Sequence, residues 1–300
     1  MKKLIRKGKI KEVYEISGER LEFFFTDSIS VFDKLVPNEI PRKGETLCKT
    51  SSYWFEKTEE LGINTHFIER KGKKRMEVRS TDVIEDHNSI DEDTTDFLIP
   101  LEFITRYFVT GSLHDRIERG EIDHEELGFD QEPERGEKLP ESFFEVRGKL
   151  EGYERRLTKK EALSISGLTG EEFEEIKASV FKIDGLIKEK VEKNDLVHVK
   201  GKKEFAMDEN REPMVVDTFG TADEDRWWVK SEYEKGNIAP KSREFIKRHY
   251  KDIGYHEKLM KAKKEGKEDP PIPELSEEMV ERITEMYVDL MSRLTDGKFR

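Results

Sequence analysis

The sequence predicts an α+β protein, in which a small antiparallel sheet precedes a larger α/β lobe with helices at its C-terminal end. Residues 1 to about 100 consist mainly of short apolar alternations separated by turns, which are typical of strands. Helical periodicity is frequent after residue 159. The acidic stretch 85–96 ends before Ile99-Pro100 and is typical of a boundary. We therefore expect one lobe over residues 1–98 and a second over residues 99–300.

In the first lobe, alternating apolar residues predict four strands around one helix. The first two strands, 9–16 and 19–27, meet at the Ser17-Gly18 turn. A helix follows near residues 50–61, and two further strands, 65–70 and 73–80, meet around Gly72. This arrangement suits a small antiparallel sheet that carries one helix.

The second lobe mixes strands with longer helices. Its predicted elements are a strand at 101–109, a helix opened by Ser112, a polar insertion at 121–140, helices near 159–165 and 170–193, and a hairpin from Lys200 to Trp228. Near the end, Ser276 is placed to cap a last helix. Its apolar stripe comprises Met279, Val280, Ile283, Met286, Tyr287, Leu290 and Leu294, and predicts docking onto a core.

Composition excludes several classes of protein. Of the 300 residues, 34% are hydrophobic and 41% charged, which suits a globular chain with a real core. Basic and acidic residues are interspersed, so we expect no nucleic-acid partner. No apolar run approaches the roughly 18 residues of a membrane span, so we expect a cytoplasmic protein without membrane contact. Cys48 is the only cysteine, which excludes an intrachain disulfide.

The hairpin carries the strongest indication of chemistry. A turn centred between Asn210 and Arg211 would place Glu204 directly opposite Asp217. Two carboxylates that face each other across a strand pair repel, unless a hard cation such as Mg²⁺ lies between them. Lys202 lies on the same face as Glu204, within reach of a phosphate held by that cation. The alternative is a solvated hairpin in a chain rich in Glu and Lys.

Two lysines near the N-terminus form a second candidate site. Lys9 and Lys11 would project from one face of a strand, beside Gly8, which permits a close backbone approach. Such a pair could clamp a polyphosphate, although lysines on an exposed edge strand more often deter aggregation. The sequence contains no GxxxxGK[ST] and no GxGxxG, so neither a P-loop nor a Rossmann site is indicated.

The third candidate site would bind an anion. Arg106 ends a strand and Ser112 opens a helix, where free backbone N–H groups favour a phosphate. Ser112 with Asp115 also fits a capping box, which would need no ligand. Asp223 and Arg226 follow the Asp217 strand in a polar loop, near the predicted metal. The adjacent Trp227 and Trp228 are expected in the core rather than as a platform for a base.

Taken together, these segments resemble the SAICAR synthetase family of purine biosynthesis, in its archaeal-type branch. The matches are collinear along nearly the whole chain: GKIKEVYE, FTDSISVFD, IPRKGETLC, GINTHFI, IPLEFITRYFVTGS, the hairpin, and RLTDGK. The family ligates L-aspartate to the carboxylate of carboxyaminoimidazole ribotide (CAIR), with ATP hydrolysed to ADP and phosphate. Its first domain is similar to the nucleotide-binding lobe of protein kinases and ATP-grasp enzymes.

The resemblance assigns a role to each candidate residue. It implies ATP contacts for Lys9, Lys11 and Lys202, Mg²⁺ ligands in Glu204 and Asp217, ribotide-phosphate contacts for Arg106, Ser112 and Arg226, and nucleotide contacts for Asp223. In the loop that approaches the reacting carboxylate, Lys149 is kept and Glu154 stands where the family has Asp. Glu224 and Asp225 replace two serines, and these carboxylates would repel a phosphate unless they point away or pair with cations.

Three functions therefore remain in view. The first is the ATP-dependent ligation of aspartate to the ribotide through an acyl phosphate. The second is a related ligase or small-molecule kinase with a different acceptor, which the altered loop around Glu154 keeps open. The third is a nucleotide-binding paralogue without catalysis, against which the intact Lys202, Glu204 and Asp217 argue. The sequence leaves the oligomeric state open, and a homo-oligomer is compatible with it.

Overall fold

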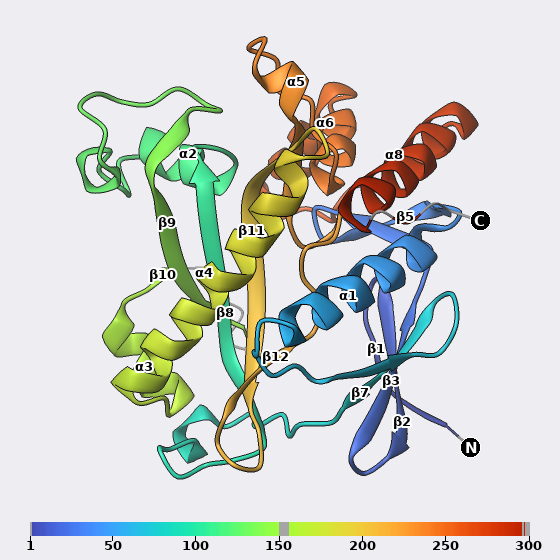
Figure 1. Cartoon of the computed structure of the whole chain (residues 1–300). Helices are drawn as coiled ribbons and strands as arrows, with labels where there is room; N and C mark the ends of the chain where they lie inside the picture. The colour runs from blue at the N-terminus through green and yellow to red at the C-terminus, as the bar shows by residue number, and fades with distance from the viewer. Residues whose placement is uncertain (1, 150–155, 296, 298–300) are drawn as a thin grey trace.

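The computed structural model describes residues 2–149, 156–295 and 297, which contain two large antiparallel sheets and a two-stranded sheet of β4 and β5 (Figure 1). Among the described residues, the N-terminal sheet has the order β1-β2-β3-β7-β6. Its strands are β1 (Lys3–Lys7), β2 (Lys11–Ser17), β3 (Arg20–Phe25), β6 (Phe67–Arg70) and β7 (Arg75–Arg79). The four strands expected from the sequence are present, and β1 is added at the edge.

One helix packs against this sheet, as expected, but it begins earlier than the sequence indicated. The strands β4 (Ser28–Val31) and β5 (Lys34–Glu39) lead into α1, which spans Lys43–Glu59. The Asp27 carboxylate accepts the Gly44 N–H at 2.9 Å, so a residue 17 positions upstream binds the helix start. A Cβ on Gly44 would lie 2.2 Å from the Phe25 carbonyl oxygen, so only glycine permits this close packing. Such a long-range contact carries no local capping signal.

The second sheet forms the centre of the molecule. Its described strands run in the order β10-β9-β8-β11-β12, and β13 also pairs with β11. Their bounds are β8 (Phe97–Phe108), β9 (Lys138–Gly148), β10 (Arg156–Leu157), β11 (Leu196–Met207), β12 (Pro213–Val216) and β13 (Arg226–Val229). The sequence did not predict β9, because much of this strand is exposed and charged, which hides its alternation.

One edge of β11 is shared by two strands. Its C-terminal half pairs with β12, from Glu204 to Met207, and its N-terminal half pairs with β13, from Leu196 to Lys200. The connection 217–225 therefore runs beside the middle of β11 instead of continuing the ladder. This interruption brings the polar loop against Lys202, which contacts Glu224 and Asp225.

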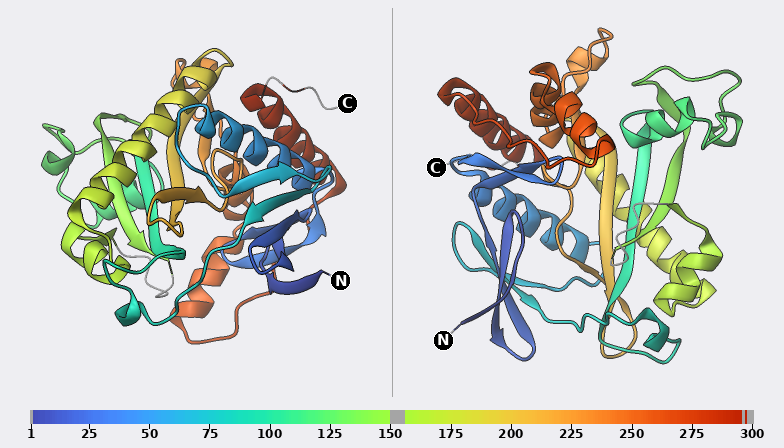
Figure 2. Two further views of the ribbon diagram at one scale, coloured as in Figure 1. Left: turned by 60° about the horizontal axis from the view of Figure 1, so that its bottom comes forward. Right: turned by 180° about the vertical axis from the view of Figure 1, so that it is seen from behind.

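Helices cover the two sheets (Figures 1 and 2). On one face of the central sheet lie α3 (Lys159–Ser166) and α4 (Gly170–Glu192), both opened by threonine capping boxes. The last helix, α8 (Glu277–Thr295), packs against α1 and is capped by Ser276 as predicted. The remaining helices are α2 (Ser112–Glu118), α5 (Lys230–Tyr233), α6 (Arg243–Asp252) and α7 (Tyr255–Lys264), with 3₁₀ turns η1 (His87–Ser89) and η2 (Glu125–Leu127).

A hydrophobic core runs through both lobes. One cluster joins Phe23 of the first sheet, Phe103 of the second and Leu290 of α8. Trp227 and Trp228 are fully buried, which confirms their predicted place in the interior. No described helix has both the length and the apolarity needed to span a bilayer. The division at residue 98 stays a prediction, because the lobes share this core.

Candidate active site

The hairpin of β11 and β12 differs by one position from its predicted register. Glu204 faces Val216, not Asp217. The Asp208 carboxylate accepts the N–H groups of Asn210 and Glu212, at 2.8 and 2.9 Å, which centres the turn on Asn210. Because β12 ends at Val216, Asp217 leaves the strand with a φ of 60°. The predicted direct pairing is therefore wrong.

Both carboxylates nevertheless reach the same group of lysines, here called the lysine–carboxylate cluster: Lys11, Lys149, Lys202, Glu204 and Asp217. The Lys11 ammonium group is ion-paired with Asp217, and that of Lys149 with Glu204. Lys202 Nζ lies 2.8 Å from the second oxygen of Glu204. The cluster thus joins β2, the end of β9, β11 and the loop after β12.

The lysines and carboxylates of this cluster shift one another's pKa values toward the charged forms. Burial would raise the pKa of Asp217, but Lys11, Lys149 and Lys202 hold it far below its ordinary value. Burial would likewise raise the pKa of Glu204, yet Lys202 and Lys149 lower it. Conversely, burial would lower the pKa of Lys149, and Glu204 and Asp217 raise it instead. Asp217, Glu204 and Lys149 are therefore charged at neutral pH, as a binding site for a metal and a polyphosphate requires.

A further carboxylate belongs to this site and was missed from the sequence. Glu102 of β8 is the cross-strand partner of Glu204, and its side chain lies 3.3 Å from Lys202 Nζ. Glu102 and Glu204 are therefore the two carboxylates that face each other across a strand pair. Their repulsion favours a cation between them, as was expected for Glu204 and Asp217. Only the pairing of β8 with β11 reveals it, because the two residues are 102 positions apart.

The two acidic replacements in the loop are both neutralised. Glu224 is ion-paired with Lys202 at 2.9 Å. Asp225 is buried, contacts His198 Nε2 at 2.8 Å and accepts the backbone N–H of Lys202 at 3.3 Å. Neither carboxylate is left unpaired beside an anion site. Asp225 instead fastens the loop to β11, which positions Arg226.

Two predicted site residues, Lys9 and Asp223, lie apart from the lysine–carboxylate cluster. Lys9 lies in the bend between β1 and β2, so it does not share a strand face with Lys11, and its ammonium group pairs with the exposed Asp33 at 2.7 Å. The Asp223 carboxylate is buried against Lys43 at 2.7 Å, which argues against a direct ligand contact. Glu154 lies outside the described residues.

The arginine site lies further along the same sheet face, and comprises Arg106, Ser112 and Arg226. Arg106 donates from Nε and Nη2 to Glu145, at 2.9 and 2.6 Å, and from Nη2 to Ser112 Oγ at 3.1 Å. The predicted capping box of Ser112 is wrong, because Gly111 is the N-cap of α2 and no side chain caps it. The serine hydroxyl faces the arginine instead.

Gly111 allows Arg226 to complete this site. A Cβ on Gly111 would lie 2.7 Å from Arg226 Nη1, so a larger residue would displace the guanidinium group. The same Nη1 donates to Thr110 Oγ1 at 3.3 Å. Two arginines therefore converge near the start of α2, with a hydroxyl beside them. This is a suitable arrangement for a phosphate.

A buried ion pair supports the opposite face of β11. The Lys203 ammonium group is ion-paired with Asp184 of α4, and both side chains are at most 1% exposed. Thr105 and Tyr107 of β8 donate hydroxyl hydrogen bonds to the same carboxylate. This network fixes β8, β11 and α4 relative to one another, and so holds the charged face in register.

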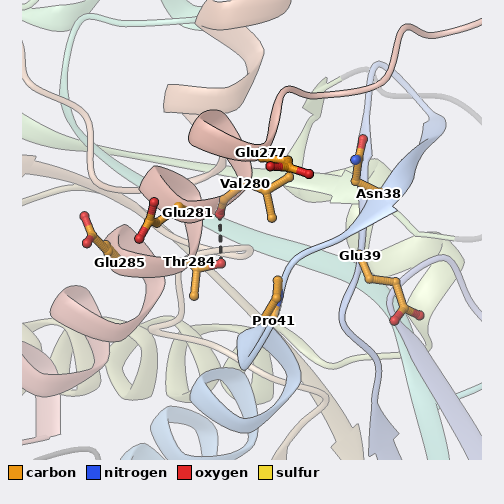
Figure 3. Close-up of a pocket in the computed structure, with 8 residues that line it drawn as sticks. All are labelled: Asn38, Glu39, Pro41, Glu277, Val280, Glu281, Thr284 and Glu285. Atoms are coloured by element: carbon orange, nitrogen blue, oxygen red, sulfur yellow. Dashed lines mark hydrogen bonds between the residues drawn. The ribbon is translucent and has the colours of Figure 1, made fainter.

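A separate hollow of about 510 Å³ lies between β5 and α8 (Figure 3). None of the predicted site residues lines it. Its walls carry the carboxylates of Glu39, Glu277, Glu281 and Glu285, which would repel a phosphate. The hollow is therefore a poor site for ATP or a ribotide.

Comparisons with known proteins identify the family that this chain resembles. The family model described as SAICAR synthetase matches residues 4–262. Two relatives named phosphoribosylaminoimidazole-succinocarboxamide synthase, from Thermoplasma acidophilum and Thermoplasma volcanium, are each 46% identical and cover 99% of this chain and 100% of their own.

Solved structures share the fold. A structure titled SAICAR-synthase from Saccharomyces cerevisiae complexed SAICAR has a TM-score of 0.74 at 22% identity, over 99% of this chain and 95% of its own. Another, titled SAICAR synthetase (Type-2) in complex with ADP, has a TM-score of 0.69 at 22% identity, over 98% and 99%. The α+β fold expected from the sequence is thereby confirmed.

Proposed function

Since the chain belongs to the SAICAR synthetase family, we propose that it joins L-aspartate to the carboxylate of CAIR at the expense of ATP. The family match and the names of the relatives support ATP-dependent ligation in purine biosynthesis, and they do not favour a different acceptor or a non-catalytic role. The observation that carries the proposal is the sharing of one sheet face by the lysine–carboxylate cluster and the arginine site.

The spacing of the two sites suits a substrate with different groups at its two ends. On β11, Lys200 marks the arginine site, because it pairs with Arg106, and Glu204 marks the lysine–carboxylate cluster. These two residues are four positions apart, or about 13 Å along an extended strand. A ribotide carries a phosphate at one end and a reacting carboxylate at the other. Arg106, Ser112 and Arg226 would hold the phosphate. The carboxylate would then point along β11 toward Lys202 and Glu204.

The lysines of the cluster would change partners when ATP binds. Among the described residues, Lys11, Lys149 and Lys202 are paired with carboxylates of Asp217, Glu204, Glu102 and Glu224. Polyphosphate oxygens compete for the same ammonium groups. Each lysine that turns to a phosphate releases a carboxylate. The ADP complex among the structural relatives is consistent with nucleotide binding by this fold.

The released carboxylates fit Mg²⁺, because it prefers hard oxygen ligands. Glu204 and Asp217 would hold it, and Glu102 is placed to assist opposite Glu204. When bound, the metal supplies neutralising charge at the transferring phosphoryl group. The lysines supply the same kind of stabilisation from the protein.

The reaction needs activation, because a carboxylate has no good leaving group. We infer that a ribotide carboxylate oxygen attacks the γ-phosphorus of ATP, forming a C–O–P linkage as ADP departs. The aspartate amine then attacks the acyl carbon, the C–O bond breaks, and inorganic phosphate leaves. Lys11, Lys149 and Lys202 would stabilise charge on the phosphoryl oxygens in both steps. By resemblance, Lys149 and Glu154 belong to the loop that closes over the acyl phosphate.

Measurement of ADP release from the purified chain tests this function directly. We expect release only when ATP, Mg²⁺, CAIR and L-aspartate are all present, together with stoichiometric SAICAR. ADP release that needs the ribotide but gains nothing from aspartate would indicate a kinase with this acceptor. Nucleotide binding without ADP release under any combination would support the non-catalytic paralogue.

A further inference from the structure

Three cations lie side by side on neighbouring strands at the arginine site. Lys200 of β11 is the cross-strand partner of Arg106 in β8 on one side and of Arg226 in β13 on the other. Cross-strand partners direct their side chains to the same face of a sheet, and like charges in directly opposite positions destabilise the pairing. A row of three cations therefore requires a compensating anion.

The protein supplies that anion to the two arginines but not to the lysine. Arg106 is bound to Glu145, and Arg226 Nε lies 3.3 Å from Glu244. For Lys200, no ion pair or hydrogen bond of the ammonium group is found within the described part of the chain. The nearby Asp225 is already engaged by His198 and by the backbone N–H of Lys202.

We propose that Lys200 is the third cation of the ribotide-phosphate site and binds the phosphate together with Arg106 and Arg226. This inference rests on the proposed function, and it adds a substrate-binding residue to the arginine site. A phosphate dianion bound here would contact one cation from each of the three strands β8, β11 and β13. Half-buried Lys200 would thereby gain the anionic partner that the described part of the protein does not provide.

Charge in the surroundings makes this contact sensitive to pH. Burial, Arg106, Arg226 and Lys202 lower the pKa of Lys200 to about 7, against the opposing effect of Asp225. The charged groups next to the two arginines already have partners. Glu145 pairs with Arg106 and Arg116, and Glu244 pairs with Arg226. A bound phosphate favours the protonated lysine, so above pH 7 ribotide binding should draw a proton onto Lys200. The ribotide KM should accordingly rise from pH 7 to 8.5.

Lys200→Arg separates this effect from titration of the phosphate itself. Arginine stays protonated throughout this range. The variant should therefore keep a ribotide KM close to that of the wild type at pH 6.5, and its KM should stay nearly constant up to pH 8.5. Parallel pH profiles of the two proteins would overturn the assignment.

The decisive comparison uses Lys200→Met with CAIR and with its riboside, which lacks the phosphate. Calorimetry on the full-length chain should show at least a 10-fold loss of affinity for the ribotide and less than a 2-fold loss for the riboside. Lys188→Met is the matched control, because it removes a lysine from α4, where Nζ lies 3.3 Å from the centre of the Tyr107 ring. That control should bind both compounds as the wild type does.

Other outcomes would overturn the proposal. Equal losses for ribotide and riboside, or unchanged ribotide affinity in a folded Lys200→Met chain, would exclude a phosphate contact. A reduced kcat with an unchanged ribotide KM would instead make Lys200 a proton acceptor. Failure of the proposed function is distinguishable, because the wild type would then release no ADP with CAIR and aspartate, whatever the effect of residue 200 on binding.

Discussion

Replacing Arg226 by methionine removes a predicted phosphate contact with little damage to the fold. The Arg226 side chain is 20% exposed, with Nε at 3.3 Å from Glu244 and Nη1 at 3.3 Å from Thr110 Oγ1. Both contacts are long, and a partly exposed ion pair of this kind contributes about 0–1 kcal/mol to stability. Within the described part of the chain, Nη2 has no hydrogen-bond partner. The variant should therefore fold normally and lose mainly its affinity for the ribotide.

The expected loss follows from the contact that is removed. A hydrogen bond to a charged group contributes about 1.5–3 kcal/mol, which corresponds to roughly a 10- to 150-fold increase in the ribotide KM. The KM for ATP should change by less than about 2-fold, because ATP would bind at the lysine–carboxylate cluster. Arg106 is a less clean target, since its removal also deprives the buried Glu145 of two hydrogen bonds.

Initial rates of ADP release, with ribotide varied at saturating ATP and aspartate, measure this effect. Arg135→Met is the matched control, because Arg135 Nη2 lies 3.8 Å from the same Glu244 but its side chain is 56% exposed. The control should keep the KM of the wild type. A normal ribotide KM in Arg226→Met would refute the assignment, and a raised ATP KM with a normal ribotide KM would mean that the two pockets are exchanged.

Three further variants test other parts of the site and its support. Asp217→Asn should abolish ADP release with an unchanged circular dichroism spectrum, because a metal carboxylate is lost; full activity at ordinary Mg²⁺ would remove Asp217 from the site. If the loop near Lys149 closes over the acyl phosphate, Glu154→Gln should lower kcat more than either nucleotide KM, and Glu154→Asp should retain more activity; equal kcat for Gln and wild type would contradict this role. Lys203→Met leaves the buried Asp184 charge without its ammonium partner, so urea denaturation should show a loss of about 3–5 kcal/mol, and a loss below about 1 kcal/mol would argue against the buried pair. Burial opposes ionisation of Asp184, but Lys203 and His198 lower its pKa to about 2, so its stabilising effect should be complete above about pH 4 and should disappear as the pH falls toward 2; Asp184→Asn should lack this part of the acid sensitivity.

The sequence by itself determined those features that depend on neighbouring residues. Alternation along a strand places Lys200, Lys202 and Glu204 on one face of β11, and this follows from backbone geometry alone. The apolar stripe and serine cap of α8 were readable for the same reason. The collinear motifs also identified the family before any contact was known.

Only the tertiary structure decided which distant residues meet that face. Glu102 reaches Glu204 because β8 pairs with β11, and Lys11 reaches Asp217 although 206 positions separate them. The hairpin register was missed by one residue, because the Asp208 carboxylate selects the turn and alternation alone does not fix its length. Strand pairing and loop placement depend on the packing of the whole chain, so local periodicity can supply the charged groups of a site but cannot specify their partners.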